Sequence, residues 1–364
     1  MMKRNILAVV IPALLVAGTA NAAEIYNKDA NKLDLTGRVH AGYTFNNQSD
    51  ENSDNTNARL GFKGQTQITS DLTGYGTFEH QFDANKTEDR NGSAGKTRKA
   101  FAGLKFADFG SFDYGRNTGV AYNGLAYTDV LPENGGDSSI TDTLTGRIGN
   151  AATFNTTNFF GLVDGLGFGL QYVAKDDEKN GAGVSVDRLD RQHGDAWATS
   201  LSYDTDFGVG VVASYGAYDR TQTQQATTTA GAKGDRADVW ATGLKYDANN
   251  VYLAATYGEA RNFFLTNNSG IADESKIFEV VAQYNFDFGL TPTLAYVSRK
   301  DKVNTAADVS GYSVKYASVG GTYAFNKNFS TYVEYDINLL DKNQTKSFGQ
   351  DNGDVVNVGV IYQF

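Results

Sequence analysis

The feature that most constrains this chain is a two-residue alternation of apolar and polar side chains, repeated in segment after segment. The closing segment "DVVNVGVIYQF" places Val358, Val360 and Tyr362 on one parity and Asn357 and Gly359 on the other. The same alternation runs through "ARLGFKGQTQI" (58–68), "VWATGLKYD" (239–247) and "VYLAATYGE" (251–259). Successive side chains of a β-strand point to opposite faces, so the pattern predicts an all-β chain whose sheet has one apolar and one polar face.

The alternating segments form a regular meander in which short and long connections alternate along the chain. Short connections such as "SDLTG" (70–74) and "DANN" (247–250) carry the Asp, Asn and Gly that tight turns require. An even number of antiparallel strands, with turns on one side and loops on the other, is typical of a transmembrane β-barrel. We therefore predict 16 strands in one domain, near 32–46, 56–69, 73–84, 97–107, 110–118, 149–159, 166–175, 195–204, 208–220, 237–247, 250–262, 276–287, 291–300, 313–325, 329–341 and 354–364.

A large secreted β-sandwich is the alternative architecture, since its apolar face would pack inward against a second sheet. The mean hydropathy of −0.41 does not separate the two classes, because barrel strands alternate between lipid and lumen. The polar face here is crowded with Gly, Ser, Thr, Asn and charged residues, and aromatic residues gather near the ends of the apolar face. Aromatic residues at both strand ends suit the interfacial girdles of a membrane barrel, which is the architecture we favour.

The N-terminus predicts export. Residues 1–4 are basic, residues 6–18 are almost wholly apolar, and Ala20-Asn21-Ala22 supplies small residues at a cleavage site. This is the layout of a secretory signal peptide. A membrane-anchoring helix is the alternative, but the apolar run is shorter than the roughly 20 residues that span a bilayer, and Pro12 interrupts it. We expect a cleaved signal peptide at 1–22 and a single barrel domain at 23–364.

Composition argues against several other classes of function. The chain has no cysteine and only three histidines, so thiolate chemistry is excluded and the residues predict no metal site, cofactor or enzyme activity. The net charge of −10 argues against nucleic acid as a partner. The segment "NGSAGKT" (91–97) has the wrong glycine spacing for a phosphate-binding loop. Acidic residues around Asp50, Glu51 and Asp54 are either solvated loop residues or ligands for divalent cations alongside lipopolysaccharide.

Long blocks of the chain resemble the general, non-specific porins of enterobacterial outer membranes. The resemblance covers the whole predicted mature chain, and it implies a homotrimer of 16-stranded barrels in outer-membrane lipid and lipopolysaccharide. It further implies one water-filled pore per subunit for ions and small hydrophilic solutes, narrowed by a third loop that folds inward. The resemblance is carried by "AEIYNKDANKLDLTGRV" (23–39), "ARLGFKGQTQI" (58–68), "LTGYG" (72–76), "KTRKAFAGLKFADFGSFDYGRN" (96–117), "LPENGGD" (131–137), "NFFGLVDGL" (158–166), "WATGLKYDANNVYLAATYGE" (240–259), "AQYNFDFGLTPTLAY" (282–296), "YAFNKNFSTYVEY" (323–335) and "VGVIYQF" (358–364).

The resemblance also implies which residues form the narrow part of the pore. Asp129 and Glu133, in the long connection at 119–148, match the acidic side of the constriction. Without the resemblance they would be interpreted as solvated acids near a Pro-Gly turn. The matching positions on the basic wall are Arg38, Arg59, Arg98 and Arg147, with Glu79 as a wall acid. Residue parity independently places Arg59 on the face of Lys63 and Gln65, although lumen-facing arginines far from the loop remain an alternative.

Three residues depart from the family pattern. Asn123, upstream of Asn134 in the same connection, stands where relatives often have an acid. Asn134 stands where relatives carry an aromatic residue at the loop tip, so we expect the tip to pack less firmly against the wall. Lys99 falls on the same parity as Phe101, where an apolar residue is usual, and this parity predicts that Lys99 faces outward. A lysine facing lipid at mid-depth costs about 2–4 kcal/mol, so we expect this position to face a neighbouring subunit.

Three functions fit a barrel of this kind. We predict a passive diffusion pore whose opposed charges set up a transverse field. A substrate-specific channel is the first alternative, and it would need a track of aromatic residues along the lumen. A barrel that serves mainly as an adhesin or phage receptor is the second, and it would need a lumen plugged by bulky residues.

Overall fold

The computed structural model describes residues 23–47, 53–86, 95–136, 138–141, 143–176, 192–226, 234–266, 270–303, 309–342, 348 and 352–364. Asp50 and Glu51, proposed above as cation ligands, lie outside the described residues. In the described part of the chain no helix is long and apolar enough to cross a membrane.

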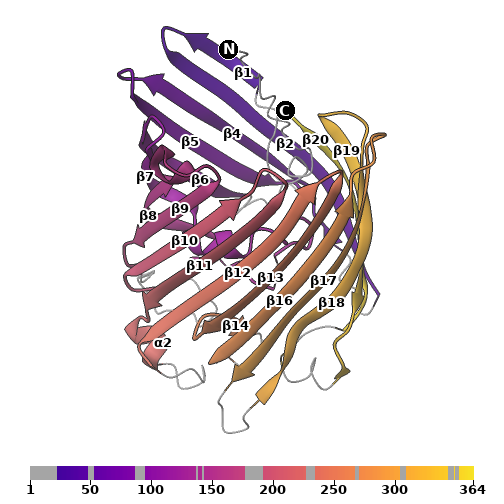
Figure 1. Ribbon diagram of the computed structural model, residues 1–364. Helices are drawn as coiled ribbons and strands as arrows, with labels where there is room; N and C mark the ends of the chain where they lie inside the picture. The colour runs from indigo at the N-terminus through magenta and orange to yellow at the C-terminus, as the bar shows by residue number, and fades with distance from the viewer. Residues whose placement is uncertain are drawn as a thin grey trace.

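The strands form one closed antiparallel barrel (Figure 1). The main sheet has 18 strands, of which β1 and β3 are short additions, so 16 strands complete the ring. The ring closes because β2 pairs with β4 on one edge and with β20 on the other. This confirms the predicted strand count and the even closure. The 16 strands are β2 (Asn31–Asn46), β4 (Asn57–Gln67), β5 (Leu72–Asp83), β6 (Gly95–Phe106), β7 (Gly110–Thr118), β8 (Arg147–Thr156), β9 (Leu166–Val173), β10 (Ala196–Asp204), β11 (Val209–Asp219), β12 (Arg236–Ala248), β13 (Val251–Arg261), β16 (Glu274–Tyr284), β17 (Leu290–Val303), β18 (Val309–Ala324), β19 (Phe329–Asn338) and β20 (Val355–Gln363).

Several short elements were not predicted from the sequence. Strand β1 (Ala23–Lys28) pairs with the first residues of β2, beyond the end of β20. The Phe364 amide donates to the Gly37 carbonyl at 2.9 Å, so β20 and β1 follow one another along the same edge of β2. The other short elements are β3 (Ser53–Asp54), β14 (Leu265–Thr266), β15 (Gly270–Ile271), the helices α1 (Asn158–Gly161) and α2 (Gln222–Ala226), and the 3-10 helix η3 (Val120–Gly124).

The two faces of the barrel divide as the alternation predicts. Outward-facing residues such as Leu201, Leu244 and Leu253 leave about half of their surface exposed (50%, 54% and 46%). Their neighbours Ser200 and Ala254 face inward and are buried. Aromatic side chains flank the outer face of β10, with Trp197 near one end and Tyr203 near the other. The outer surface is therefore apolar enough to contact lipid.

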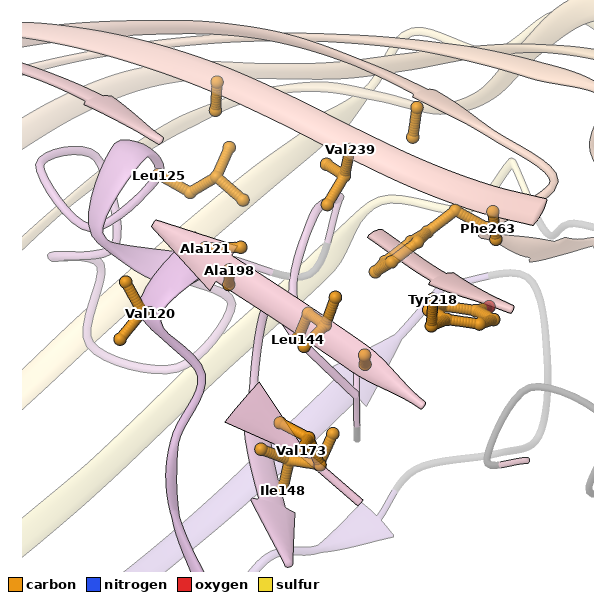
Figure 2. Packing of buried hydrophobic residues seen from close by; sticks show 14 of the residues in the cluster. Val120, Ala121, Leu125, Leu144, Ile148, Val173, Ala198, Tyr218, Val239 and Phe263 are labelled. Atoms are coloured by element: carbon orange, nitrogen blue, oxygen red, sulfur yellow. The ribbon is translucent and has the colours of Figure 1, made fainter. Parts of the chain in front are cut away.

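The connection at 119–146 folds into the barrel and packs against β9, β10, β11 and β12 through η3. Val120, Ala121, Leu125 and Leu144 form a buried cluster with small side chains of the wall, among them Ala198 and Ala241 (Figure 2). Gly124 approaches the wall so closely that a Cβ atom there would lie 2.8 Å from the Ala241 carbonyl oxygen. The lumen thus contains an apolar core, which the inward parity pattern did not suggest.

A β-bulge in β6 corrects the predicted direction of Lys99. Glu79 pairs with Lys99 while His80 pairs with Thr97, so Arg98 is the extra residue. One inserted residue reverses the facing of everything on one side of it. Lys99 therefore lies on the lumen face with Glu79, and Phe101 lies there too. The expectation that Lys99 faces outward, toward a neighbouring subunit, was wrong because the strand is not regular at Arg98.

Candidate functional site: a charged passage inside the barrel

A cavity of about 490 Å³ lies between the inward loop and the barrel wall. It is lined by six of the seven residues that the sequence predicts for the constriction: Arg38, Arg59, Arg98, Arg147, Asp129 and Glu133. The seventh, Glu79, contacts the cavity wall through Arg98, whose Nε lies 2.5 Å from Glu79 Oε1. The fold thus brings all seven residues, spread over 110 positions of sequence (38 to 147), into one region.

The arginines come from β2, β4, β6 and β8, on one side of the passage. Arg38 on β2 and Arg59 on β4 are direct cross-strand partners, although like charges opposite one another are unfavourable. Acceptors on β5 stabilise this arrangement: Arg59 Nε donates to Gln81 Oε1 at 3.0 Å, and Arg98 donates to Glu79. Among the seven predicted residues, Glu79 is the wall acid that faces four guanidinium groups, so this side of the cavity stays positively charged.

The acidic side is held by tyrosine hydroxyls. Tyr122 donates to Asp129 Oδ2 at 2.6 Å, and Tyr332 donates to Glu133 Oε2 at 3.0 Å. His40 Nε2 lies 2.8 Å from the Tyr332 oxygen. Because Tyr332 donates its proton to Glu133, its oxygen accepts from His40, which corresponds to the Nε2–H tautomer. The hydrogen-bonded chain from His40 through Tyr332 to Glu133 orients this carboxylate, and the sequence did not reveal it.

The loop tip is tied to the barrel wall at β18 and β19 by hydrogen bonds. The Glu133 and Asn134 amides each donate to a Glu334 carboxylate oxygen at 3.1 Å. Asn134 Nδ2 donates to Asp336 Oδ2 at 2.5 Å, and Tyr316 donates to the Asn134 carbonyl at 2.9 Å. The expectation of a loosely packed tip at Asn134 was wrong, because an amide facing two buried acids replaces ring packing with directional bonds.

A second acid anchors the middle of the loop. Glu279 on β16 is 1% exposed and accepts hydrogen bonds from Thr128 at 2.5 Å and from Ser138. Arg299 on β17 adds a bond from its guanidinium to the Ser138 carbonyl at 3.2 Å. A buried carboxylate is costly unless it is hydrogen-bonded, so Glu279 and Glu334 favour the inward loop. Their place on the lumen parity of β16 and β19 is the one sequence signal that could have identified them.

Comparison with known proteins gives the family. Residues 28–364 match the sequence model of the Gram-negative porin family. The chain belongs to this family. The porin is 53% identical over 380 residues to outer membrane porin F of Escherichia coli, and 50% identical over 382 residues to outer membrane protein F of Serratia marcescens. Both alignments cover all of this chain and all of the relative.

Solved structures agree with this result. A structure of Salmonella typhi OmpF in complex with daunomycin superimposes with a TM-score of 0.86 at 43% identity, covering 94% of this porin and all of that chain. An anion-selective porin from Comamonas acidovorans shares the fold, with a TM-score of 0.67 at 15% identity over 92% of this porin and all of that chain. The protein is a general porin of the outer membrane, and a porin is a channel.

Replacing Glu334 tests how the loop tip is held. Glu334→Leu removes both acceptors of the Glu133 and Asn134 amides, and a buried amide left without a partner costs about 1–3 kcal/mol. We expect lower resistance to chemical unfolding in lipid vesicles and more frequent current steps in single-channel recordings. Glu334→Gln keeps one acceptor and should give an intermediate effect. Glu259→Leu, which removes an acid bonded to Tyr257, is the matched control. If the Glu334→Leu variant shows current steps no more often than the wild type, the anchoring role is contradicted.

Proposed function

We propose that the barrel is a passive, weakly selective diffusion channel for ions and small hydrophilic solutes. In this proposal Asp129 and Glu133 form the acidic side of the constriction, and Arg38, Arg59, Arg98 and Arg147 form the basic side, with Glu79 as the wall acid. The observation that carries the proposal is the cavity itself, which has loop carboxylates and wall guanidinium groups among its lining residues.

Opposed charges across a narrow passage act on every solute that enters it. The Debye length is about 8 Å at physiological ionic strength, so an ion that passes within this distance of the fixed charges is only partly screened from them. Charged side chains lining a pore are an ordinary source of ion selectivity. Water dipoles align in the transverse field, and an apolar solute that displaces them loses this favourable interaction. Small polar solutes are therefore favoured over apolar solutes of the same size.

We also propose that the chain has no enzyme activity and requires no cofactor. Diffusion through a water-filled pore breaks and forms no covalent bond, so the charged residues need only stay fixed in place. Their hydrogen bonds to Tyr122, Tyr332 and Gln81 fit this requirement.

Planar-bilayer recording distinguishes the candidate functions. A diffusion channel should show a large, ohmic conductance with weak ion selectivity, because ions cross a hydrated gap without binding tightly. Conductance that saturates with one sugar would instead indicate a substrate-specific channel. Absence of conductance from correctly folded protein would indicate an adhesin or receptor barrel.

We further propose that the porin is a homotrimer in outer-membrane lipid and lipopolysaccharide, and that residues 1–22 are a cleaved signal peptide. The family resemblance supports the trimer, and the basic, apolar and small-residue layout of residues 1–22 supports cleavage. Protein extracted from membranes should have the mass of residues 23–364, and unheated samples should migrate as a trimer that boiling converts to monomer. The mass of the full-length chain would contradict cleavage of the signal peptide. The same gel mobility before and after boiling would contradict the trimer.

Neutralising the loop acids tests their role directly. The double variant Asp129→Asn with Glu133→Gln leaves the arginines unopposed, so the reversal potential in a salt gradient should shift toward anion selectivity. The control Asp71→Asn with Asp206→Asn removes two acids from exposed turns and should leave the reversal potential as in the wild type. An unchanged reversal potential in the loop variant would refute the proposed constriction.

A further inference from the structure

Lys99 is a cation on the lumen wall at a position where the family pattern has an apolar residue. It lies on β6 directly after the bulged Arg98 and opposite Glu79. Glu79, Lys63, Arg98 and Arg147 are among the charged groups close enough to act on Lys99, and they all belong to the lumen side of the barrel. The bulge therefore presents two consecutive basic side chains, Arg98 and Lys99, to the same lumen.

A second cavity lies on the short-turn side of Lys99, and its lining includes Ala107, Asp108 and Gly110 of one short turn. This cavity, of about 580 Å³, is lined by Tyr75 and Phe101 and by two lysines and three aspartates, Lys63, Lys105, Asp34, Asp108 and Asp113, among others, and we call it the turn-side vestibule. Along β6, Arg98 lines the constriction cavity and Phe101 lines the vestibule. Lys99 lies between these two residues in the strand, so its backbone position is at the border between the two cavities.

We propose that Lys99 is a selectivity-determining residue that extends the basic wall of the constriction by one cation, up to the border of the turn-side vestibule. Beyond that border Lys63 and Lys105 face Asp34, Asp108 and Asp113, so the added positive charge is confined to the stretch beside Arg98. Small anions such as chloride or inorganic phosphate are then stabilised on leaving the arginine cluster, and cations are disfavoured over the same distance. The proposal rests on the constriction described under Proposed function, and it assigns Lys99 a role of its own.

The acid opposite Lys99 does not cancel its charge by contact alone. Glu79 is the cross-strand partner of Lys99, but its carboxylate already lies 2.5 Å from Arg98 Nε. Lys99 and Arg98 therefore share one acid. A lysine placed only to pair with Glu79 would not be expected beside a competing arginine, because like charges at short range raise its energy.

A purely structural role is the competing explanation, in which the Lys99 stem fills space and its charge balances Glu79. The two roles differ in their dependence on charge and on salt. A selectivity effect follows the sign of the charge at position 99 and weakens at high salt, since the Debye length falls to about 3 Å at 1 M. A packing effect follows neither.

The experiment measures reversal potentials of Lys99 variants in planar bilayers under a KCl gradient. Lys99→Met keeps an unbranched stem, and Lys99→Glu reverses the charge. One unit charge acting across about one Debye length of water changes the cation-to-anion permeability ratio about twofold, so we expect about a twofold rise for Lys99→Met and about fourfold for Lys99→Glu. Lys99→Arg should keep the wild-type ratio, and both shifts should shrink in molar salt.

The control is Lys28→Met, which removes a lysine from β1 whose side chain is 74% exposed and pairs with Asp29. It should leave the permeability ratio unchanged. Heat-modified gel mobility identifies folded protein, and Lys99→Glu provides the test if Lys99→Met does not assemble. If the loop-acid variant shifts selectivity but neither Lys99 variant does, the role of Lys99 is wrong while the constriction stands. If the loop-acid variant also leaves the permeability ratio unchanged, the constriction itself is refuted.

Discussion

The pairing of β2 with β20 is the interaction on which the rest of this porin depends. A sheet in lipid cannot leave a row of backbone N–H and C=O groups bare, since each unsatisfied group costs several kcal/mol. Nine residue pairs between the two strands, from Arg38–Gln363 to Asn46–Val355, remove that edge. Strand β1 then occupies the remaining edge of β2 beyond Phe364. Closure fixes the interior, and the interior fixes where charged side chains can lie.

The inward loop is the second constraint, and it combines two kinds of stabilisation. At one end an apolar cluster around Leu125 and Leu144 packs against small wall residues such as Ala198. At the tip and in the middle, buried acids on the wall accept hydrogen bonds from loop amides and hydroxyls. Apolar burial is non-directional, whereas hydrogen bonds to Glu334 and Glu279 specify a position. Together they hold Asp129 and Glu133 within the cavity that the wall arginines line, which is the geometry that the proposed transverse field requires.

Lys99 and Asn134 show where sequence reasoning failed and why. Parity counts assume a regular strand, and a single bulged residue at Arg98 reversed the facing of Lys99 and Phe101. No feature of "KTRKAF" marks the bulge, because it depends on how β5 and β6 pair. Asn134 was expected to loosen the loop because its partners, Glu334 and Asp336, lie 200 residues away. The hydrogen-bonded chain from His40 to Glu133 was missed for the same reason.

The sequence by itself determined the all-β class, the 16 strands, the alternation of turns and loops, and the outward and inward faces of most strands. These properties follow from local rules, since pleating has a period of two and tight turns need Gly, Asn or Asp. Only the tertiary structure decided which lumen residues meet across the pore, how the loop is anchored, and that Lys99 faces the lumen. Those outcomes depend on strand register and on contacts between residues far apart in the chain, which no local pattern encodes.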